Sequence, residues 1–321
     1  MRHHRAVIVG ALLAVQACAH SQPYEQSYLR ASDNWVFRRE YSRTDRLFNA
    51  FDYGHAILSE TLLRHPDGAA ARLEGRERAF IVSQLLRDPP RVPLDEQAIA
   101  PAYAQLVPEA IATFDWAHAL HRQLYDIIGD QVLTTDARAR RVQQALSYYR
   151  SRRDLALSAT PKSMALMEGQ EYSLAFRRMA PRYNQLIWSY HWLQMGIYDA
   201  LLRSDDYGAR HVAVDATVAR FFDMLADSSK VPSAMPMSAA IAPLFSARYP
   251  EAAIIFDNLH ALHDVVSDIL SSPTIPQSGK RAAILTALGR YRDSTSFVTS
   301  RAEWAEMARS MGLEQMGGAI P

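Results

Sequence analysis

The stretch Phe114-Asp115-Trp116-Ala117-His118-Ala119-Leu120-His121 occurs a second time, as Phe256-Asp257-Asn258-Leu259-His260-Ala261-Leu262-His263. The shared pattern is F-D-x-x-H-A-L-H, and the numbers of matching positions differ by 257 − 115 = 142. A shorter relative, Phe51-Asp52-Tyr53-Gly54-His55-Ala56, lies upstream. Residues three apart lie on one face of a helix. Each stretch therefore predicts a helix with a carboxylate beside an imidazole, and in the two longer copies a second histidine extends the stripe.

The two halves of the chain match well beyond this motif. Ala98-Ile99-Ala100-Pro101 recurs as Ala240-Ile241-Ala242-Pro243, with the same difference in numbering. Upstream the difference becomes 199 − 60 = 139, where Glu60-Thr61-Leu62-Leu63-Arg64 matches Asp199-Ala200-Leu201-Leu202-Arg203. An insertion between the two blocks explains the change. We predict two tandem repeats that form one compact domain: residues 41–180 and 181–321.

The composition is that of a helical globular protein. Apolar residues make up 49% and charged residues 21% of the chain, and only 13 of its 321 residues are glycine. Apolar side chains recur at helical spacing, and no clear alternating strand pattern appears. We predict an all-α fold, a helical bundle of two tandem repeats of about five helices with pseudo-two-fold symmetry. The helices are expected at residues 43–64, 70–87, 102–130, 136–157 and 162–179 in the first copy, and at 181–203, 208–227, 245–271, 278–297 and 301–311 in the second.

Several classes of function find no support in the sequence. The formal net charge of +1 gives no electrostatic argument for nucleic acid as a partner. No glycine-rich nucleotide-binding or phosphate-binding motif occurs. The one cysteine, Cys18, excludes both a disulfide framework and a C-x-x-C-H site for haem c. No nucleophile with a base can be assigned, so the catalytic residues remain unknown and the sequence leaves open whether the protein is an enzyme.

The N-terminus has the features of an export signal. Met1-Arg2-His3-His4-Arg5 is basic, and the apolar run from Ala6 to Ala17 is too short to span a bilayer. Val15-Gln16-Ala17-Cys18 resembles a bacterial lipobox, with Gln16 an uncommon residue in its slot. The resemblance to bacterial lipoproteins implies a signal peptide over residues 1–17, lipid on Cys18, and a tether over residues 18–40.

The same resemblance implies a location. The lipid would anchor the protein in a membrane bilayer from the periplasmic side, and in the sorting rule of enteric bacteria the lack of Asp after Cys18 implies the outer membrane. The alternative is ordinary cleavage at Ala17-Cys18-Ala19, which would release a soluble periplasmic protein. We favour the lipoprotein, because the only cysteine of the chain falls where a lipobox requires it.

Aligning the repeats extends the motif to a fourth helix. His191 falls at the position of Asp52, and Gln194 falls at that of His55. Aromatic neighbours indicate that these positions are buried, and a buried Asp is costly unless it is paired or coordinates a metal. The predicted metal ligands are Asp52, His55, Asp115, His118, His191, Asp257 and His260. His121 and His263 continue the stripe by one turn and are not included in this set.

Four helices that carry carboxylates and histidines at x-x-H spacing resemble the ferritin-like di-metal bundles. In that family two helices give a Glu and two give Glu-x-x-His. The resemblance implies a mono- or dinuclear transition-metal site between the helices, with a redox or metal-handling role. This sequence departs from the family in having Asp in place of Glu, and in having His191 where a carboxylate is expected. The nitrogen-rich set suits Fe, Zn or Cu better than Mg or Ca.

The alternative interpretation is structural. A buried Asp can hold a buried His in one tautomer, and such pairs can hold helices together. The protein would then be a non-enzymatic scaffold or accessory lipoprotein of the cell envelope, with another envelope protein as its partner. Geometry separates the two interpretations. Metal binding requires His118 and His260 to converge with Asp115 and Asp257, whereas the scaffold predicts separate Asp–His pairs.

Overall fold

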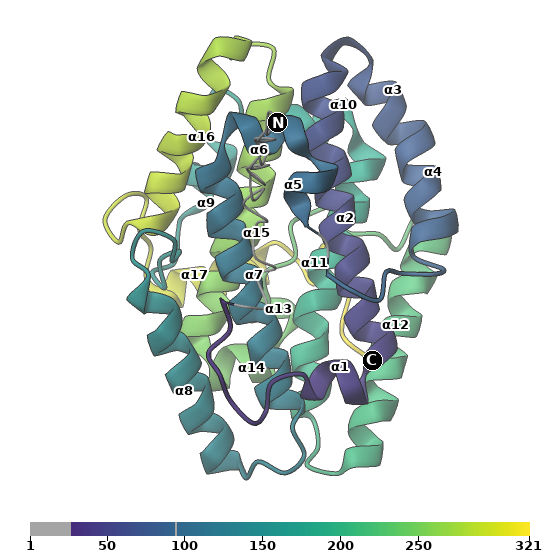
Figure 1. Cartoon of the computed structure of the whole chain (residues 1–321), viewed down its shortest axis with the longest axis vertical. Coiled ribbons are helices and arrows are strands. Elements are labelled where there is room, and N and C mark those ends of the chain that lie inside the picture. Colours follow the sequence, from purple (N-terminus) through teal and green to yellow (C-terminus); the bar gives the residue numbers. More distant parts are fainter. Residues whose placement is uncertain (1–26, 94) are drawn as a thin grey trace, which may run out of the picture.

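The computed structural model describes residues 27–93 and 95–321, which form a bundle of helices joined by loops (Figure 1). Within these residues no β-strand occurs, and only Lys162 and Val298 form an isolated bridge. The predicted all-α fold is confirmed. Four long helices form the centre, and each packs against two of the others. They are α2 (Ser42–Arg64), α7 (Pro108–Gly129), α11 (Pro181–Leu202) and α15 (Pro250–Ser271).

Outer helices cover the two sides of this centre. In Figure 1, α8 and α16 lie on one side, and α12 and the run from α3 to α4 lie on the other. The contacts agree, because α8 and α16 pack on α7 and α15, while α12 packs on α11. The outer helices are α3 (Ala69–Arg72), α4 (Arg78–Phe80), α8 (Thr135–Ser151), α12 (Tyr207–Ala226) and α16 (Gln277–Arg292). The centre is therefore enclosed, and its polar side chains must find partners inside the protein.

The two helices predicted to contain Pro108 and Pro250 each divide in two at that proline. The preceding residues, Val107 and Tyr249, leave helical geometry, with φ of −148° and −132°. Proline has no N–H to continue the helix, and its ring disfavours a helical conformation in the residue before it. The shorter helices that result are α6 (Pro101–Leu106) and α14 (Pro243–Arg248).

The predicted helix over residues 162–179 also divides. The structure has α9 (Met164–Glu168) and α10 (Ala175–Met179) in its place. Leu174 stands between them with φ of 66°, a left-handed conformation that no helix of L-residues continues through. A leucine gives no sequence signal for such a residue, so the pattern of apolar spacing alone runs across the break.

The tandem repeat extends to the lengths and order of the helices. Both α7 and α15 have 22 residues, both α6 and α14 have 6, and both α5 and α13 have 4. Within each pair the first residues keep the same difference in numbering as the sequence motifs, and α1 and α10 keep the smaller upstream difference. The remaining α-helices are α1 (Val36–Glu40), α5 (Glu96–Ile99), α13 (Ser238–Ile241) and α17 (Arg301–Ser310). The matching helices thus start at α1 in one half and at α10 in the other, while the boundaries of the repeats and the two-fold axis stay predictions.

Each copy begins with the same hydrogen-bonded corner. Trp35 and Leu174 both adopt left-handed φ angles, of 72° and 66°. In the first copy the carboxylate of Asp126 accepts the backbone N–H groups of Trp35 and Phe37, at 3.0 and 2.8 Å. In the second copy Asp268 accepts two equivalent N–H groups, both at 2.8 Å. Because a left-handed non-glycine residue costs about 1–2 kcal/mol, these bonds hold a conformation that the chain would not choose alone.

We expect Asp126→Asn and Asp268→Asn each to lower the free energy of unfolding by about 2–3 kcal/mol, because an amide has one acceptor oxygen and turns its NH2 toward the second backbone N–H. Urea unfolding followed by circular dichroism measures the loss. The exposed Asp136 provides the control, and Asp136→Asn should change the stability by less than about 0.5 kcal/mol. A large loss in one corner and none in the other would show that the corners are not equivalent.

The segment expected to form a tether is bound to the bundle over its described part. Gln123 on α7 accepts the N–H of Leu29 at 3.0 Å and donates to its carbonyl at 2.8 Å. Tyr28 stacks on Trp35, with ring centroids 5.1 Å apart. The predicted signal peptide and Cys18 lie outside the described residues. Among the described helices, none has the length and apolar character that crossing a membrane requires.

Candidate metal centre

Six of the eleven histidines of the chain gather where the four central helices meet. They are His55 on α2, His118 and His121 on α7, His191 on α11, and His260 and His263 on α15. The ring centroids of His55 and His263 are 4.4 Å apart, those of His191 and His260 are 4.0 Å apart, and His118 lies 5.5 Å from His263. The motif helices therefore bring their histidines into one cluster.

The contacts between the two copies are reciprocal. Phe114 of the first copy packs against His263 of the second, with ring centroids 4.1 Å apart. The equivalent Phe256 of the second copy packs against His121 of the first, at 4.0 Å. Such mutual exchange is what a two-fold relation between similar units produces. His263 of the second copy thus lies among residues of the first copy, and His121 of the first copy lies among residues of the second.

Three of the histidines have the spacing of a metal site. One ring nitrogen from each of His55, His191 and His263 lies within 4.8 Å of the other two, and this is the only group of its kind within the described residues. Nitrogen ligands of tetrahedral zinc, at bonds of about 2.0–2.1 Å, lie roughly 3.3 Å apart, so a shift of about an ångström would complete the geometry. The three side chains come from three different helices, which fixes the position of the group in the bundle.

Several buried ring nitrogens in the cluster have no hydrogen-bond partner among the described residues. His55 Nδ1 donates to the carbonyl of Phe51 at 2.9 Å, which leaves the lone pair of Nε2 without a partner. Both ring nitrogens of His191 and His260, and Nδ1 of His263, are also without one. Each such buried group costs about 1–3 kcal/mol, and native proteins hold few of them. A metal ion would supply the missing partner.

Burial keeps these imidazoles neutral. It lowers the pKa of His55 to about 4, to which the charge of nearby His118 contributes, and lowers the pKa of His118 to about 3. It also lowers the pKa of His191, His260 and His263 well below the ordinary value. The neutral imidazole is the form that binds metal. Each neutral ring keeps one N–H and offers the lone pair of its other nitrogen, so the cluster can bind a cation at neutral pH without first losing positive charge.

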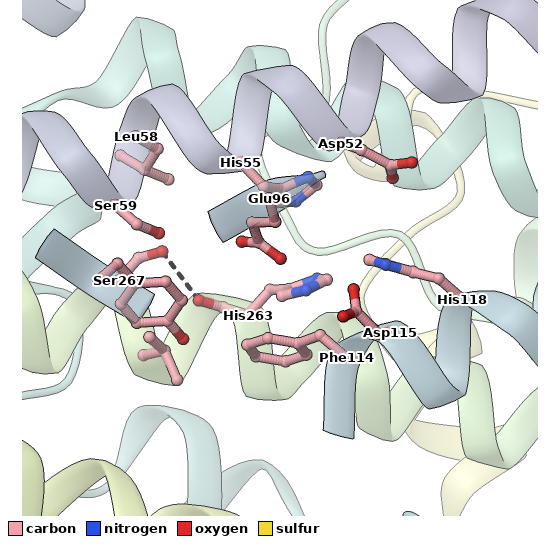
Figure 2. A pocket seen from close by; sticks show the side chains of 12 residues that line it. Asp52, His55, Leu58, Ser59, Glu96, Phe114, Asp115, His118, His263 and Ser267 are labelled. Carbon is pink, nitrogen blue, oxygen red and sulfur yellow. Dashed lines mark hydrogen bonds between the residues drawn. The ribbon is translucent and has the colours of Figure 1, made fainter. Parts of the chain in front are cut away.

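A small pocket lies beside His55 and His263 (Figure 2). Glu96 on the short helix α5 and Asp115 on α7 both direct their carboxylates into it, and the ring of His118 faces the same space. The pocket thus places two carboxylates and a further imidazole next to two members of the three-histidine group. This combination of oxygen and nitrogen donors is typical of transition-metal sites.

Of the three carboxylates that line the pocket, Asp52 pairs with Arg122, whereas Glu96 and Asp115 need a positive partner. Burial raises the pKa of Asp115 to about 7, and the charges of Asp52 and Asp95 add to the effect. Burial and the charge of Asp115 also raise the pKa of Glu96 well above its ordinary value. At neutral pH and without a metal, the pair therefore holds a proton that two solvated carboxylates would release. A bound cation could take the place of that proton.

The two remaining predicted aspartates have partners other than histidine. Asp52 lines the pocket and accepts from the guanidinium of Arg122 at 3.0 Å. Asp257 accepts from the backbone N–H and the hydroxyl of Ser238, at 2.9 and 2.5 Å, and from an indole N–H at 2.8 Å. Because both ring nitrogens of His260 lack a partner, the Asp257–His260 hydrogen bond of the scaffold interpretation does not form.

The structure separates the seven predicted ligands into four sets. His55 and His191 belong to the three-histidine group, and His260 stacks on His191. Asp52, Asp115 and His118 line the pocket. Asp257 belongs to neither the group nor the pocket and binds Ser238. The prediction did not include His263 and Glu96. His263 lies on the same helical stripe as His260 and recurs as His121, and this repetition was the available signal. Glu96 comes from outside the central helices, and only its place two residues before the repeated Ala98-Ile99-Ala100-Pro101 pointed to it.

Comparison with known protein families, with curated proteins and with solved structures finds no match to this chain. The arguments about its function therefore rest on the site itself.

Proposed function

We propose that this protein binds a transition-metal ion through His55, His191 and His263. The observation that carries the proposal is the approach of three ring nitrogens to within 4.8 Å of one another, inside a cluster whose buried nitrogens lack other partners. A core that needed only packing would gain more from apolar side chains, because each unpaired polar nitrogen weakens it.

The donor set supports Fe, Zn or Cu. Imidazole suits all three metals, whereas Mg and Ca prefer sites made of oxygen ligands. Glu96, Asp115 and His118 offer further ligands in the adjoining pocket, so the site has donors for a mononuclear or a dinuclear centre. We propose a redox or metal-handling role, since such a set serves either electron chemistry or storage of the ion.

Elemental analysis of the protein, purified without a histidine tag, tests the proposal. We expect Fe, Zn or Cu at close to one or two ions per chain. A protein that is metal-free and resists loading with each of these ions would refute it. That result would favour the second candidate, an envelope scaffold or accessory protein, in which the contacts of Asp52 with Arg122 and of Asp257 with Ser238, in place of Asp–His pairs, hold the helices together.

The affinity for the metal should rise with pH between 6 and 8. Burial raises the pKa of Asp115 to about 7, so below that pH its proton competes with the metal. Burial lowers the pKa of His55 and His118 to about 4 and about 3, so neither ring carries a positive charge between pH 6 and 8. One displaced proton gives up to about a tenfold change in affinity per pH unit. Competition with a chromogenic chelator at pH 6, 7 and 8 measures the slope, and Asp115→Asn should flatten it. An affinity that does not change between pH 6 and 8, or a slope that Asp115→Asn leaves unchanged, would contradict this assignment.

We also propose that the protein is exported and carries lipid on Cys18, which would anchor it to the outer membrane and face it to the periplasm. The lipobox-like Val15-Gln16-Ala17-Cys18 after a basic and apolar leader supports this. Labelling of cells with a radioactive fatty acid checks it. The wild type should carry the label and Cys18→Ser should not, and an unlabelled wild type would favour the soluble periplasmic form.

A further inference from the structure

The pocket beside His263 has a counterpart in the other repeat that is filled. The alignment of the two copies identifies the equivalent positions. Ser59, which lines the pocket, corresponds to Tyr198, and Ser267 corresponds to Tyr125. Two small side chains at the pocket thus stand where the second site has two large ones.

The rings at the second site stack on one another. Tyr198 lies 4.4 Å from Tyr125 and 4.0 Å from Phe245, which is the equivalent of Tyr103 in the pocket. The tyrosine and phenylalanine side chains here are at most 1% exposed. The hydroxyl of Tyr198 donates to the carbonyl of His121 at 2.8 Å and so holds its ring in place. At these equivalent positions the same helical frame is therefore packed with rings, and the small pocket of the second repeat is lined by other residues, among them Asp257, Met235 and Met237. The space beside His263 thus goes with its two serines.

The polar lining differs between the two sites in the same way. Ser238 occupies the position of Glu96, and its hydroxyl donates to Asp257, the equivalent of Asp115. The filled site thus contains one satisfied carboxylate, whereas the open pocket has two facing carboxylates. Even with one proton between them, the two facing carboxylates of the open pocket leave a negative charge there, which disfavours small anions relative to neutral molecules.

The pocket is small. The centre of a water-sized molecule can move within about 20 Å³ there. One ordered water needs about 10–15 Å³ on this measure, so the space holds one or two waters. A molecule of two or three heavy atoms fits, and an organic substrate does not.

We propose that this pocket is the route by which a neutral molecule of two or three heavy atoms, of the size of dioxygen or hydrogen peroxide, reaches the metal at His55, His191 and His263. The proposal rests on the metal-binding function argued above and names the class of ligand that the site admits. Ser59 and Ser267 keep the route open, and the acid pair of Glu96 and Asp115 selects against anions.

The filled repeat suggests the decisive variants. Ser59→Tyr and Ser267→Tyr each introduce the residue of the filled site without removing a metal ligand, and Ser59→Ala and Ser267→Ala are the matched controls. All four proteins and the wild type are loaded anaerobically with Fe(II), and the bound iron is measured first. Nitric oxide, a neutral diatomic molecule, is then added, and the iron–nitrosyl complex is followed by absorbance and electron paramagnetic resonance. We expect equal iron in all five proteins, and nitric oxide binding at least about tenfold slower in the tyrosine variants.

Each outcome has a definite meaning. A wild type that takes up none of Fe, Zn or Cu refutes the metal-binding function, whereas iron-loaded tyrosine variants that bind nitric oxide as fast as the alanine variants refute the route alone. Azide, an anion of three atoms, should bind the wild type poorly and Glu96→Gln better, and equally strong binding of azide and nitric oxide to the wild type would refute the selection of neutral molecules. Ser59 is partly exposed, so Ser59→Tyr decides the question if Ser267→Tyr does not fold.

Discussion

Replacing His263 by alanine is expected to lower the affinity for a transition-metal ion by more than about 100-fold. Losing a residue that only hydrogen-bonds to a metal ligand typically costs about 10–100-fold, and losing the ligand itself should cost more. His55→Ala and His191→Ala should have effects of the same size, because each removes one of the three nitrogens that lie within 4.8 Å of one another. Competition between the protein and a chromogenic chelator for Zn(II) or Co(II) measures the change.

Two histidines outside the group serve as controls. His65 is exposed, follows the last residue of α2, and belongs to neither the three-histidine group nor the pocket, so His65→Ala should leave the affinity unchanged. His260 stacks on His191 but lies outside the three-histidine group, so His260→Ala should reduce the affinity less than about tenfold. If His118→Ala and His260→Ala abolish metal binding while the alanine variants of the three-histidine group retain it, that group is not the ligand set. Circular dichroism confirms that each variant is folded.

Arg122→Ala is expected to lower the free energy of unfolding by about 3–5 kcal/mol, the usual loss when one partner of a buried ion pair is removed. The guanidinium lies between Asp45 and Asp52, at 3.2 and 3.0 Å, and the three side chains are only 8%, 8% and 14% exposed. The variant leaves two carboxylates with little solvent and no cation between them. Urea unfolding of the metal-free protein measures the effect.

Two further measurements show whether burial of the Arg122 ion pairs causes the loss of stability: a variant of an exposed ion pair and a triple variant of the buried one. Arg281 pairs with Glu109 at 2.6 Å, but both side chains are more than 40% exposed, so Arg281→Ala should cost less than about 1 kcal/mol. Combining Arg122→Met with Asp45→Asn and Asp52→Asn removes these three buried charges and should recover most of the stability, because Arg38, which also pairs with Asp45, is 32% exposed and stays solvated. Equal losses for Arg122→Ala and Arg281→Ala would show that the buried pairs contribute no more than the exposed one.

The sequence predicted the helices and their duplication because helical spacing and a long internal repeat are properties of the chain alone. It did not predict the breaks at Val107 and Tyr249, since the apolar pattern continues through them and only the following prolines interrupt the hydrogen bonds. It also did not predict the left-handed Leu174, which depends on the carboxylate of Asp268, far along the chain. Local patterns cannot reveal a conformation held by a distant side chain.

For the site, the sequence identified the four helices and most of the cluster. His55 and His191 were predicted from the alignment of the repeats, and the structure places them in one group with His263. Asp257 followed the same D-x-x-H pattern, yet Ser238 from a neighbouring helix occupies its carboxylate. Glu96 reaches the pocket from a short helix between the motifs. Spacing along one helix fixes which side chains share a face, but the partners across that face depend on packing between helices.

The exchange of rings between the copies, Phe114 on His263 and Phe256 on His121, also bears on how the two sites came to differ. In a symmetric pair of identical chains, any substitution appears at both sites at once, so an aromatic plug that stabilised one would also close the other. Joining the copies in a single chain removes that constraint. The site around Tyr125 and Tyr198 then packs with aromatic rings, while the site beside His263 keeps its serines, its carboxylates and its pocket. One copy can therefore pack rings where the other keeps a pocket, a difference that two identical chains in a symmetric dimer cannot have.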